Sequence, residues 1–185
     1  MRTAPDTILI TPQGRAKASL QPEDLVEMDA EGHAHLGSPS SEKLMHLTIY
    51  QQCPLAKAVI HAHPPIAVAW SLARPQLTEL VANCLSELIL AVGAIPIVPY
   101  ARPGTAAMGA VLRPYLPHSR VMILAHHGAL TWGESLEEAF MGMERLEHTA
   151  RTLLYARLLG GWQELPPEEI EFLRAKRQTL GERIL

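Results

Sequence analysis

Several features that mark common protein classes are missing from this chain of 185 residues. It has no run of about 20 apolar residues, so no membrane-spanning segment is predicted, and its N-terminal segment lacks the apolar core of a signal peptide. The formal charge of −3 gives no basic footprint for a nucleic acid. Cys53 and Cys84 form no CxxC pair, and their apolar surroundings indicate buried thiols. These absences favour a soluble cytoplasmic protein.

The composition and the pattern of the chain indicate one α/β domain. Apolar residues make up 48% of the sequence, enough for a substantial core, and no repeat, linker or low-complexity segment interrupts it. Strands are predicted at 8–10, 26–29, 58–63, 94–98 and 121–125, with 129–132 extended, and helices at 40–53, 66–72, 105–115, 136–159 and from 166 to the C-terminus. Several connections are too short for parallel crossovers, which favours a mainly antiparallel or mixed sheet with helices on both sides.

The motif His61-Ala62-His63 ends a short apolar run and is followed directly by two prolines. A β-branched run closed by prolines indicates a buried strand that ends there. Side chains at positions i and i+2 of a strand point to the same face, so His61 and His63 are predicted to lie side by side. Two such imidazoles can grip a divalent metal. The alternative is a pair of exposed histidines, or of histidines satisfied within the core.

A second apolar strand leads into His126-His127-Gly128. A third histidine from this pair would complete a set of three ligands with one open position, the pattern of a catalytic metal site. Neutral imidazoles leave the +2 charge of the ion uncompensated, so the ion can act as a Lewis acid. Glu42, at a junction between a loop and a helix, either closes the open position or serves as the proton-transfer group.

The segment before the helix at 40–53 also suits an anion. Ser40 or Ser41 is predicted to cap this helix, with Glu42 in its first turn. A helix N-terminus with free N–H groups and two hydroxyls can bind a phosphate, although the same residues also fit a plain, well-capped helix. His46 lies on the same helix face as Glu42 and is interpreted as an orienting or core residue. His33 and His35 follow a turn and are expected to be exposed.

These motifs, taken together, resemble the class II aldolase/adducin family, of the fuculose-phosphate aldolase type. The similar segments occur in the order and spacing of the family and cover nearly the whole chain: 10–14, 20–25, 39–42 with His46, 59–63, 99–105 and 126–128. The resemblance implies a three-layer α/β/α fold with a mainly antiparallel central sheet, and a homotetramer with active sites between subunits.

The resemblance also implies a set of site residues. The metal ligands, to zinc or another divalent ion, would be His61, His63 and His127, because the family uses the histidine immediately before the glycine. Glu42 would be the acid/base residue; epimerases of the same fold carry an aspartate there, so Glu42 favours carbon–carbon cleavage. The implied reaction is aldol cleavage of a ketose phosphate through a metal-stabilised enediolate, with the substrate phosphate held by Gly14, Ser40 and Ser41.

The chain departs from the family pattern in three places. Family members usually begin with an additional helix and a Gly-Asn turn that binds phosphate, so residues 1–185 are expected to form a single domain without them. The third position of the 11–14 turn is Gln13, a bulkier group than usual. Tyrosines that the aldolase type places near 83–87 and in the C-terminal tail are missing, and Glu87 is considered for a proton-donor or orienting role.

Two other classes of function stay open at this point. One is a non-catalytic, adducin-like member that binds a metal or a partner. The other is a dehydratase, decarboxylase or epimerase, since these reactions share proton-transfer chemistry on one scaffold.

Overall fold

A computed structural model describes residues 1–80 and 83–185; residues 81–82, within the apolar stretch 77–92, lie outside the described part. The strands are β1 (Arg2–Ala4), β2 (Thr7–Ile10), β3 (Val26–Met28), β4 (Ala58–Ala62), β5 (Glu79–Leu80), β6 (Ile95–Val98), β7 (Val121–Leu124) and β8 (Gly128–Gly133). The α-helices are α1 (Lys43–Gln52), α2 (Pro65–Ala73), α3 (Ser86–Ala91), α4 (Ala106–Leu112), α5 (Leu136–Leu158) and α6 (Pro167–Leu180). Short 3-10 helices lie at Lys17–Ser19, Pro22–Asp24 and Arg113–Tyr115.

The central sheet has the strand order β4-β8-β7-β6-β5. Its neighbouring strands are antiparallel except for β6 and β7, which run parallel. The predicted mainly antiparallel sheet is therefore confirmed. The pairing of Ala62 with Ala129 places the end of β4 beside the start of β8, so the two histidine motifs meet at one edge of the sheet.

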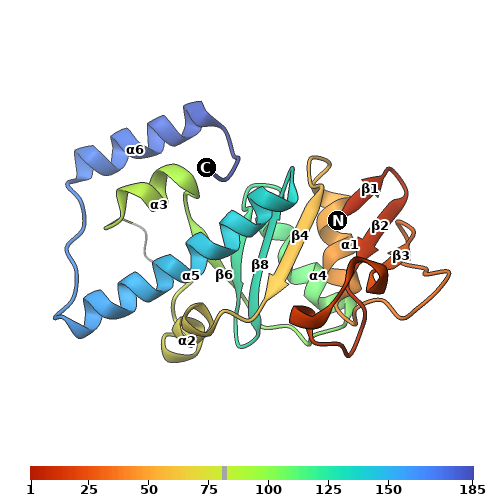
Figure 1. Cartoon of the computed structure of the whole chain (residues 1–185). Coiled ribbons are helices and arrows are strands. Elements are labelled where there is room, and N and C mark those ends of the chain that lie inside the picture. Colours follow the sequence, from red (N-terminus) through yellow and green to blue (C-terminus); the bar gives the residue numbers. More distant parts are fainter. Residues whose placement is uncertain (81–82) are drawn as a thin grey trace.

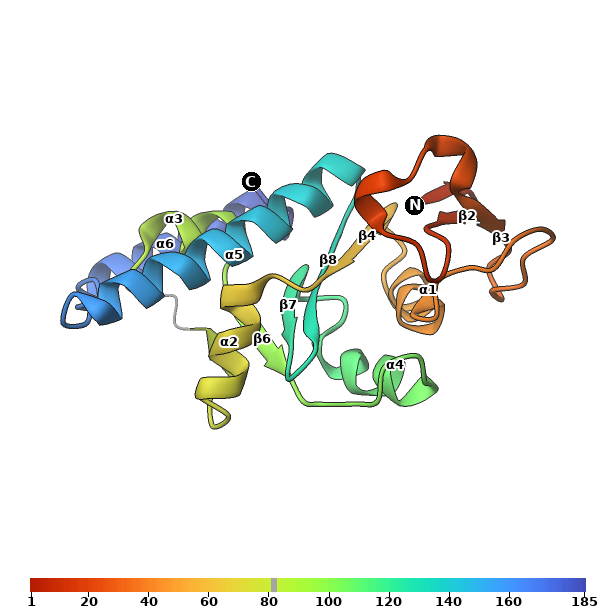
Figure 2. The same ribbon diagram turned by 60° about the horizontal axis from the view of Figure 1, so that its bottom comes forward.

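Helices cover both faces of this sheet, as Figure 2 shows: α2 and α5 lie on one side, and α1 and α4 on the other. Strand β7 is buried on both faces, and its side chains alternate between two core clusters. Met122 and Leu124 join the cluster with α1 and α4, whereas Val121 and Ile123 join the cluster with α2 and α5. This alternation follows from the two-residue period of a strand, and it explains why 121–125 is apolar at every position.

A second, smaller sheet with the order β1-β2-β3 packs beside α1, at the opposite end of the molecule from α3 and α6 (Figure 1). The loop after β2 is tied to the loop before α1 by an antiparallel bridge between Pro12 and Pro39. Backbone N–H groups of Gln13 and Ser40 donate to Ser38 and Thr11, respectively. The 11–14 turn is thereby fixed against the N-terminal end of α1.

The predicted serine cap of α1 is wrong. The N-cap of α1 is Glu42, not Ser40 or Ser41, and it makes no side-chain cap bond. The reason is local: the Ser40 hydroxyl accepts the N–H of Glu42 at 3.2 Å, inside the loop, and is not used further along the helix. Thr105 is the N-cap of α4, but its hydroxyl donates to the carbonyl of Arg102 at 2.7 Å. Ser135 is the N-cap of α5, and its Oγ accepts the N–H of Glu138 at 3.1 Å.

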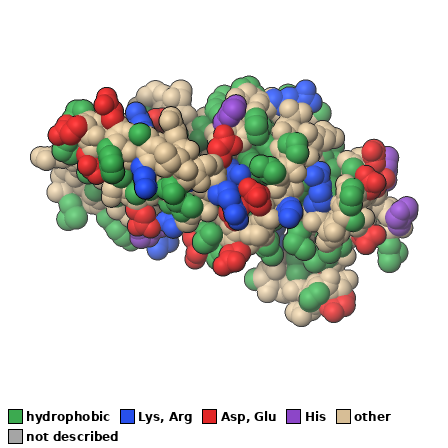
Figure 3. Space-filling model, turned by 90° about the horizontal axis from the view of Figure 1, so that it is seen from above, with side chains coloured by type: hydrophobic (Ala, Val, Ile, Leu, Met, Phe, Trp, Pro, Cys, Tyr) green, Lys and Arg blue, Asp and Glu red, His purple; other side chains and the backbone are tan. Residues whose placement is uncertain are grey.

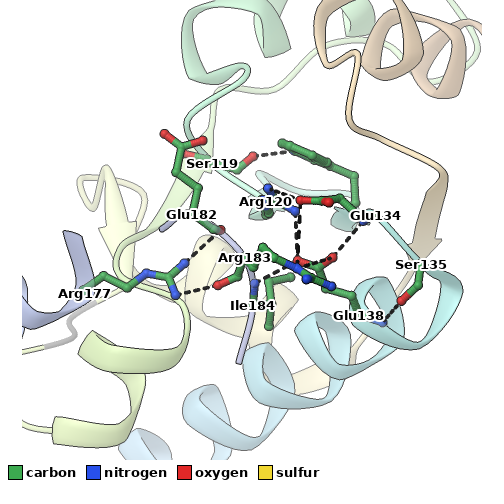
Figure 4. Close-up of polar contacts among 10 residues, drawn as sticks. Ser119, Arg120, Glu134, Ser135, Glu138, Arg177, Glu182, Arg183 and Ile184 are labelled. Carbon is green, nitrogen blue, oxygen red and sulfur yellow. Dashed lines mark hydrogen bonds and ion pairs between the residues drawn. The ribbon is translucent and has the colours of Figure 1, made fainter. Parts of the chain in front are cut away.

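The last helix does not reach the C-terminus as predicted, because it ends at Leu180 before Gly181, whose φ is +80°. The tail then returns to the body of the protein (Figure 4). Arg120 and Glu138, with side chains 4% and 3% exposed, form an ion pair at 2.9 Å, and Glu138 also accepts the N–H of Ile184 at 2.9 Å. This buried network holds the tail against α5.

The outer surface mixes charges of both signs. The face drawn in Figure 3 shows acidic and basic side chains beside one another, with hydrophobic side chains scattered among them. Among the described residues, no helix is both long enough and apolar enough to cross a membrane.

Candidate metal centre

Three histidines converge where β4 ends and β8 begins. His61 is the fourth residue of β4, His63 follows the last residue of that strand, and His127 lies in the turn between β7 and β8. The ring centroids of His61 lie 4.8 Å from those of both His63 and His127, and the latter two are 5.3 Å apart. One ring nitrogen from each side chain falls within 4.8 Å of the others, close enough for all three to hold a single ion.

The hydrogen bonds of His61 decide which of its nitrogens is free. Nδ1 lies 2.9 Å from the carbonyl oxygen of Ala129, and a carbonyl only accepts, so Nδ1 carries the proton. The lone pair is then on Nε2, which is buried and has no hydrogen-bond partner within the described part of the chain. A histidine oriented by a backbone carbonyl through one nitrogen, with the other nitrogen free, is the usual arrangement of a metal ligand. The residues present therefore fit a divalent cation.

The electrostatics of the site favour neutral imidazoles. Burial is the largest cause that lowers the pKa of His61, to about 3, and neighbouring His127 and His63 lower it as well. Burial also lowers the pKa of His127, against an opposing effect of Glu42. The half-buried ring of His46 has its pKa lowered to about 3, chiefly by desolvation and then by His61. Because only an unprotonated imidazole binds a metal, His61 and His127 are ready for an ion without having to release protons at neutral pH.

The close approach of the histidines depends on Gly128. A Cβ at this position would lie 2.5 Å from the carbonyl oxygen of Ala62, 2.7 Å from His63 Cδ2 and 3.0 Å from His61 Cε1. Such distances are too short for any side chain, so the strand ends can meet only at a glycine. His126, the residue before His127, has a φ of +58° and lies outside the triad. Its side chain is exposed, and its ring packs edge-on against that of Tyr100.

Gly128→Ala is therefore expected to weaken metal binding by roughly 10- to 100-fold, as loss of ligand alignment typically does. Its matched control is Gly133→Ala at the other end of β8, where a Cβ would lie 2.9 Å from Ala139 N, far from the triad. Each change overpacks the structure by about 1–3 kcal/mol, but only the first touches the ligands. Metal titrations beside urea unfolding of both variants separate the two effects; equal metal affinity in the two would refute this role of Gly128.

Glu42 lies beside the triad and not within it. It is not among the side chains whose ligand atoms cluster within 4.8 Å, but its charge is close enough to raise the pKa of His127. Its Oε2 is buried and has no hydrogen-bond partner among residues 1–80 and 83–185, and a Cβ at Gly104 would lie 4.0 Å from its Oε1. A carboxylate in this setting is placed to exchange a proton with a molecule bound at the triad.

Two of the three predicted phosphate residues, Ser40 and Ser41, lie together just before α1. Ser40 and Ser41 line a groove of about 450 Å³ together with Gln13 and Lys43, whereas Gly14, with a φ of +73°, is exposed and does not line it. Lys43 was missed by sequence reasoning, although a lysine directly after the predicted acid/base glutamate is a usable signal. Its Nζ donates to the carbonyl of Gly32 at 2.8 Å.

The structure also bears on two charged residues, Lys17 and Glu87. Lys17 was not singled out, yet its Nζ lies 3.0 Å from the carbonyl oxygen of His61. Glu87 is exposed and forms an ion pair with Arg145 at 2.8 Å. Both residues of that pair line a larger groove, of about 790 Å³, whose walls include none of the three triad histidines. The chemistry of the donor atoms places the candidate site at the triad and not in the larger groove.

Comparison with known proteins shows the family of this chain. Residues 1–154 match the Class II Aldolase and Adducin N-terminal domain, and the chain belongs to this family. The 3-oxo-tetronate 4-phosphate decarboxylase of Escherichia coli O6:H1 is 36% identical over 152 residues, which cover 79% of this chain and 70% of that protein. The L-fuculose phosphate aldolase of Haemophilus influenzae is 32% identical over 186 residues, covering 97% of this chain and 82% of that protein.

Solved structures show the same fold. YgbL from Escherichia coli, described as an aldolase/epimerase/decarboxylase, superimposes with a TM-score of 0.83 at 32% identity, over 91% of this chain and 82% of that one. An L-fuculose 1-phosphate aldolase superimposes with a TM-score of 0.80 at 30% identity, over 94% and 81% of the two chains. The expected family and its α/β fold are thus confirmed.

Proposed function

We propose that this chain is a metal-dependent carbon–carbon lyase that acts on a phosphorylated keto sugar or keto sugar acid. The observation that carries the proposal is the set of His61, His63 and His127, whose ligand nitrogens cluster within 4.8 Å beside the carboxylate of Glu42. Zinc is the metal expected for three imidazoles with an open position. When bound, such an ion stabilises negative charge that develops on substrate oxygens.

The two kinds of relative differ in what they release. Aldol cleavage of L-fuculose 1-phosphate breaks the bond between C3 and C4 and releases an aldehyde. Decarboxylation of 3-oxo-tetronate 4-phosphate breaks the bond between C1 and C2 and releases carbon dioxide. Both reactions leave the same three-carbon enediolate of dihydroxyacetone phosphate, with the electron pair of the broken bond on the carbon next to the ketone. One proton donor to that carbon can therefore serve either reaction, and aldol cleavage additionally needs a base that accepts the proton of the C4 hydroxyl as the aldehyde forms.

Glu42 is proposed as that donor. It would deliver a proton to the enediolate carbon, and in the reverse direction of the aldol reaction it would remove the same proton. Ser40, Ser41 and the backbone of Gly14 would contact the phosphate, near the N-terminal end of α1. Lys43, which lines the same groove as the two serines, adds a positive charge to that region.

Lys17 favours decarboxylation as the second candidate reaction. Its ammonium group contacts the backbone of His61, and its charge is one of the causes that lower the pKa of the His61 ring. The remaining N–H donors of this exposed side chain are suited to a carboxylate on a substrate bound at the triad. A ketose phosphate has no carboxylate for Lys17 to bind, whereas a keto sugar acid does.

The zinc-loaded protein should be incubated separately with L-fuculose 1-phosphate and with 3-oxo-tetronate 4-phosphate. Dihydroxyacetone phosphate is expected from either substrate. The second product identifies the reaction: an aldehyde indicates aldol cleavage, and carbon dioxide indicates decarboxylation. A protein that binds zinc but converts neither substrate, nor other phosphorylated ketoses, would contradict the proposed lyase and favour a non-catalytic member of the family.

Lys17→Met tests the choice between the two reactions. Loss of a charge-assisted hydrogen bond, worth about 1.5–3 kcal/mol, is expected to raise KM for 3-oxo-tetronate 4-phosphate by roughly 10- to 100-fold. KM for L-fuculose 1-phosphate, which has no carboxylate, should change much less. Lys57→Met, an exposed lysine just before β4, is the control. Equal effects of Lys17→Met on both substrates would contradict a carboxylate-binding role.

A further inference from the structure

Helix α2 connects the two turns that carry the candidate ligands. It begins at Pro65, two residues after His63, with Pro64 between them. Further along the helix, the buried Ser71 hydroxyl accepts the backbone N–H of His126 at 3.2 Å, directly beside His127 in the chain. The position of α2 therefore bears on both ligand-bearing turns at once.

The N-terminal end of α2 has no cap of its own. Its N-cap residue is Pro64, which offers no side-chain acceptor, and its first residue, Pro65, has no N–H to donate. The next two N–H groups, of Ile66 and Ala67, still need acceptors. Both are satisfied from outside the helix, by one side chain of α5.

That side chain is Glu147. Its Oε1 accepts the N–H of Ile66 at 3.1 Å, and its Oε2 accepts the N–H of Ala67 at 3.0 Å. Each carboxylate oxygen thus takes one donor, and its negative charge lies at the positive end of the helix dipole. A third contact fixes the same pair of helices, since the indole N–H of Trp70 donates to the carbonyl of Ala150 at 2.9 Å.

We infer that Glu147 is a positioning residue for the metal centre, which holds the start of α2 so that His63 lies in register with His61 and His127. His61 is fixed by its hydrogen bond to Ala129 within the paired strands. His63 lies beyond the last paired residue of β4 and is exposed. Its position therefore depends on the segment that follows it, which is the segment that Glu147 anchors.

This inference rests on the metal-binding part of the proposed function and not on which substrate is cleaved. The test is a titration of metal-free protein with Co²⁺, whose visible absorption bands report the geometry of the ligands. Glu147→Ala removes both acceptors. Glu147→Gln keeps the shape and one acceptor oxygen, but turns an amide donor toward the second N–H. Glu144→Gln, an exposed glutamate on the same helix, is the matched control.

Glu147→Ala is expected to weaken Co²⁺ binding by roughly 10- to 100-fold, the typical effect of losing a group that orients a ligand, and to alter the absorption bands. Glu147→Gln should give a smaller change in the same direction, and it decides the matter if the alanine variant does not fold. Glu144→Gln should match the unmodified protein in both affinity and spectrum.

Three outcomes would overturn this inference or separate it from the proposed function. If the Glu147 variants unfold more easily but bind Co²⁺ with unchanged affinity and spectrum, the residue only stabilises α2, and the inference is wrong. If the unmodified protein binds no Co²⁺, both the inference and the metal centre are wrong. If it binds Co²⁺, and the variants weaken binding, but no substrate is cleaved, only the proposed lyase reaction is contradicted.

Discussion

His61→Ala is expected to remove the metal ion from the protein almost completely. The side chain is 7% exposed, and its free nitrogen, Nε2, has no partner among the described residues. Losing one of three ligands should cost more than the roughly 10- to 100-fold that follows from losing a group that merely orients a ligand. Metal analysis of purified protein after dialysis against zinc, with and without the change, measures this directly.

The neighbouring histidines provide the controls for that experiment. His126→Ala should retain the ion, because His126 is exposed and lies against Tyr100, whereas His127→Ala should lose it. His33→Ala, an exposed histidine that precedes α1, should also retain the ion. Loss of zinc from His126→Ala together with its retention by His127→Ala would show that the wrong member of the pair had been assigned.

Glu42→Gln is expected to lower kcat by about 10²- to 10⁴-fold while the metal content stays unchanged. The amide keeps the size of the carboxyl group but can neither accept nor deliver the proton at the enediolate carbon. Glu42 is not within the cluster of ligand nitrogens, so the ion should not depend on it. Turnover and zinc content of the same preparations are to be measured together.

The exposed Glu31→Gln, in a turn before α1, is a control that should change neither quantity. Wild-type turnover by Glu42→Gln would remove Glu42 from the mechanism. Loss of zinc from Glu42→Gln would make Glu42 a ligand, the alternative that the sequence itself left open.

The neighbouring positions of His61 and His63, predicted from the sequence and present in the structure, depend on a local rule. Their proximity follows from the two-residue period of a strand, and the alternation of β7 side chains between the two core clusters follows from the same rule. The resemblance to the family was needed to choose His127 over His126. Nothing local in the sequence distinguishes them, and in the structure the choice is set by the positive φ of His126 and the absent Cβ of Gly128.

The parts that were missed depend on contacts between distant segments. Glu147 is 81 residues from Ile66, and Lys17 is 44 residues from His61, so no periodicity or motif connects them. The buried ion pair of Arg120 with Glu138, and the return of the C-terminal tail to it, are likewise set by packing of elements that the sequence does not place. The wrong serine cap of α1 shows the same limit on a smaller scale, because the Ser40 hydroxyl accepts the N–H of Glu42 within the loop.

The most direct test of the metal centre is an anomalous difference map, recorded at the zinc absorption edge from crystals of zinc-loaded protein. We expect one strong peak per chain, about 2.0–2.1 Å from one ring nitrogen each of His61, His63 and His127, with His61 bound through Nε2. A peak bound by His126, or no peak among these three side chains at full zinc saturation, would contradict it.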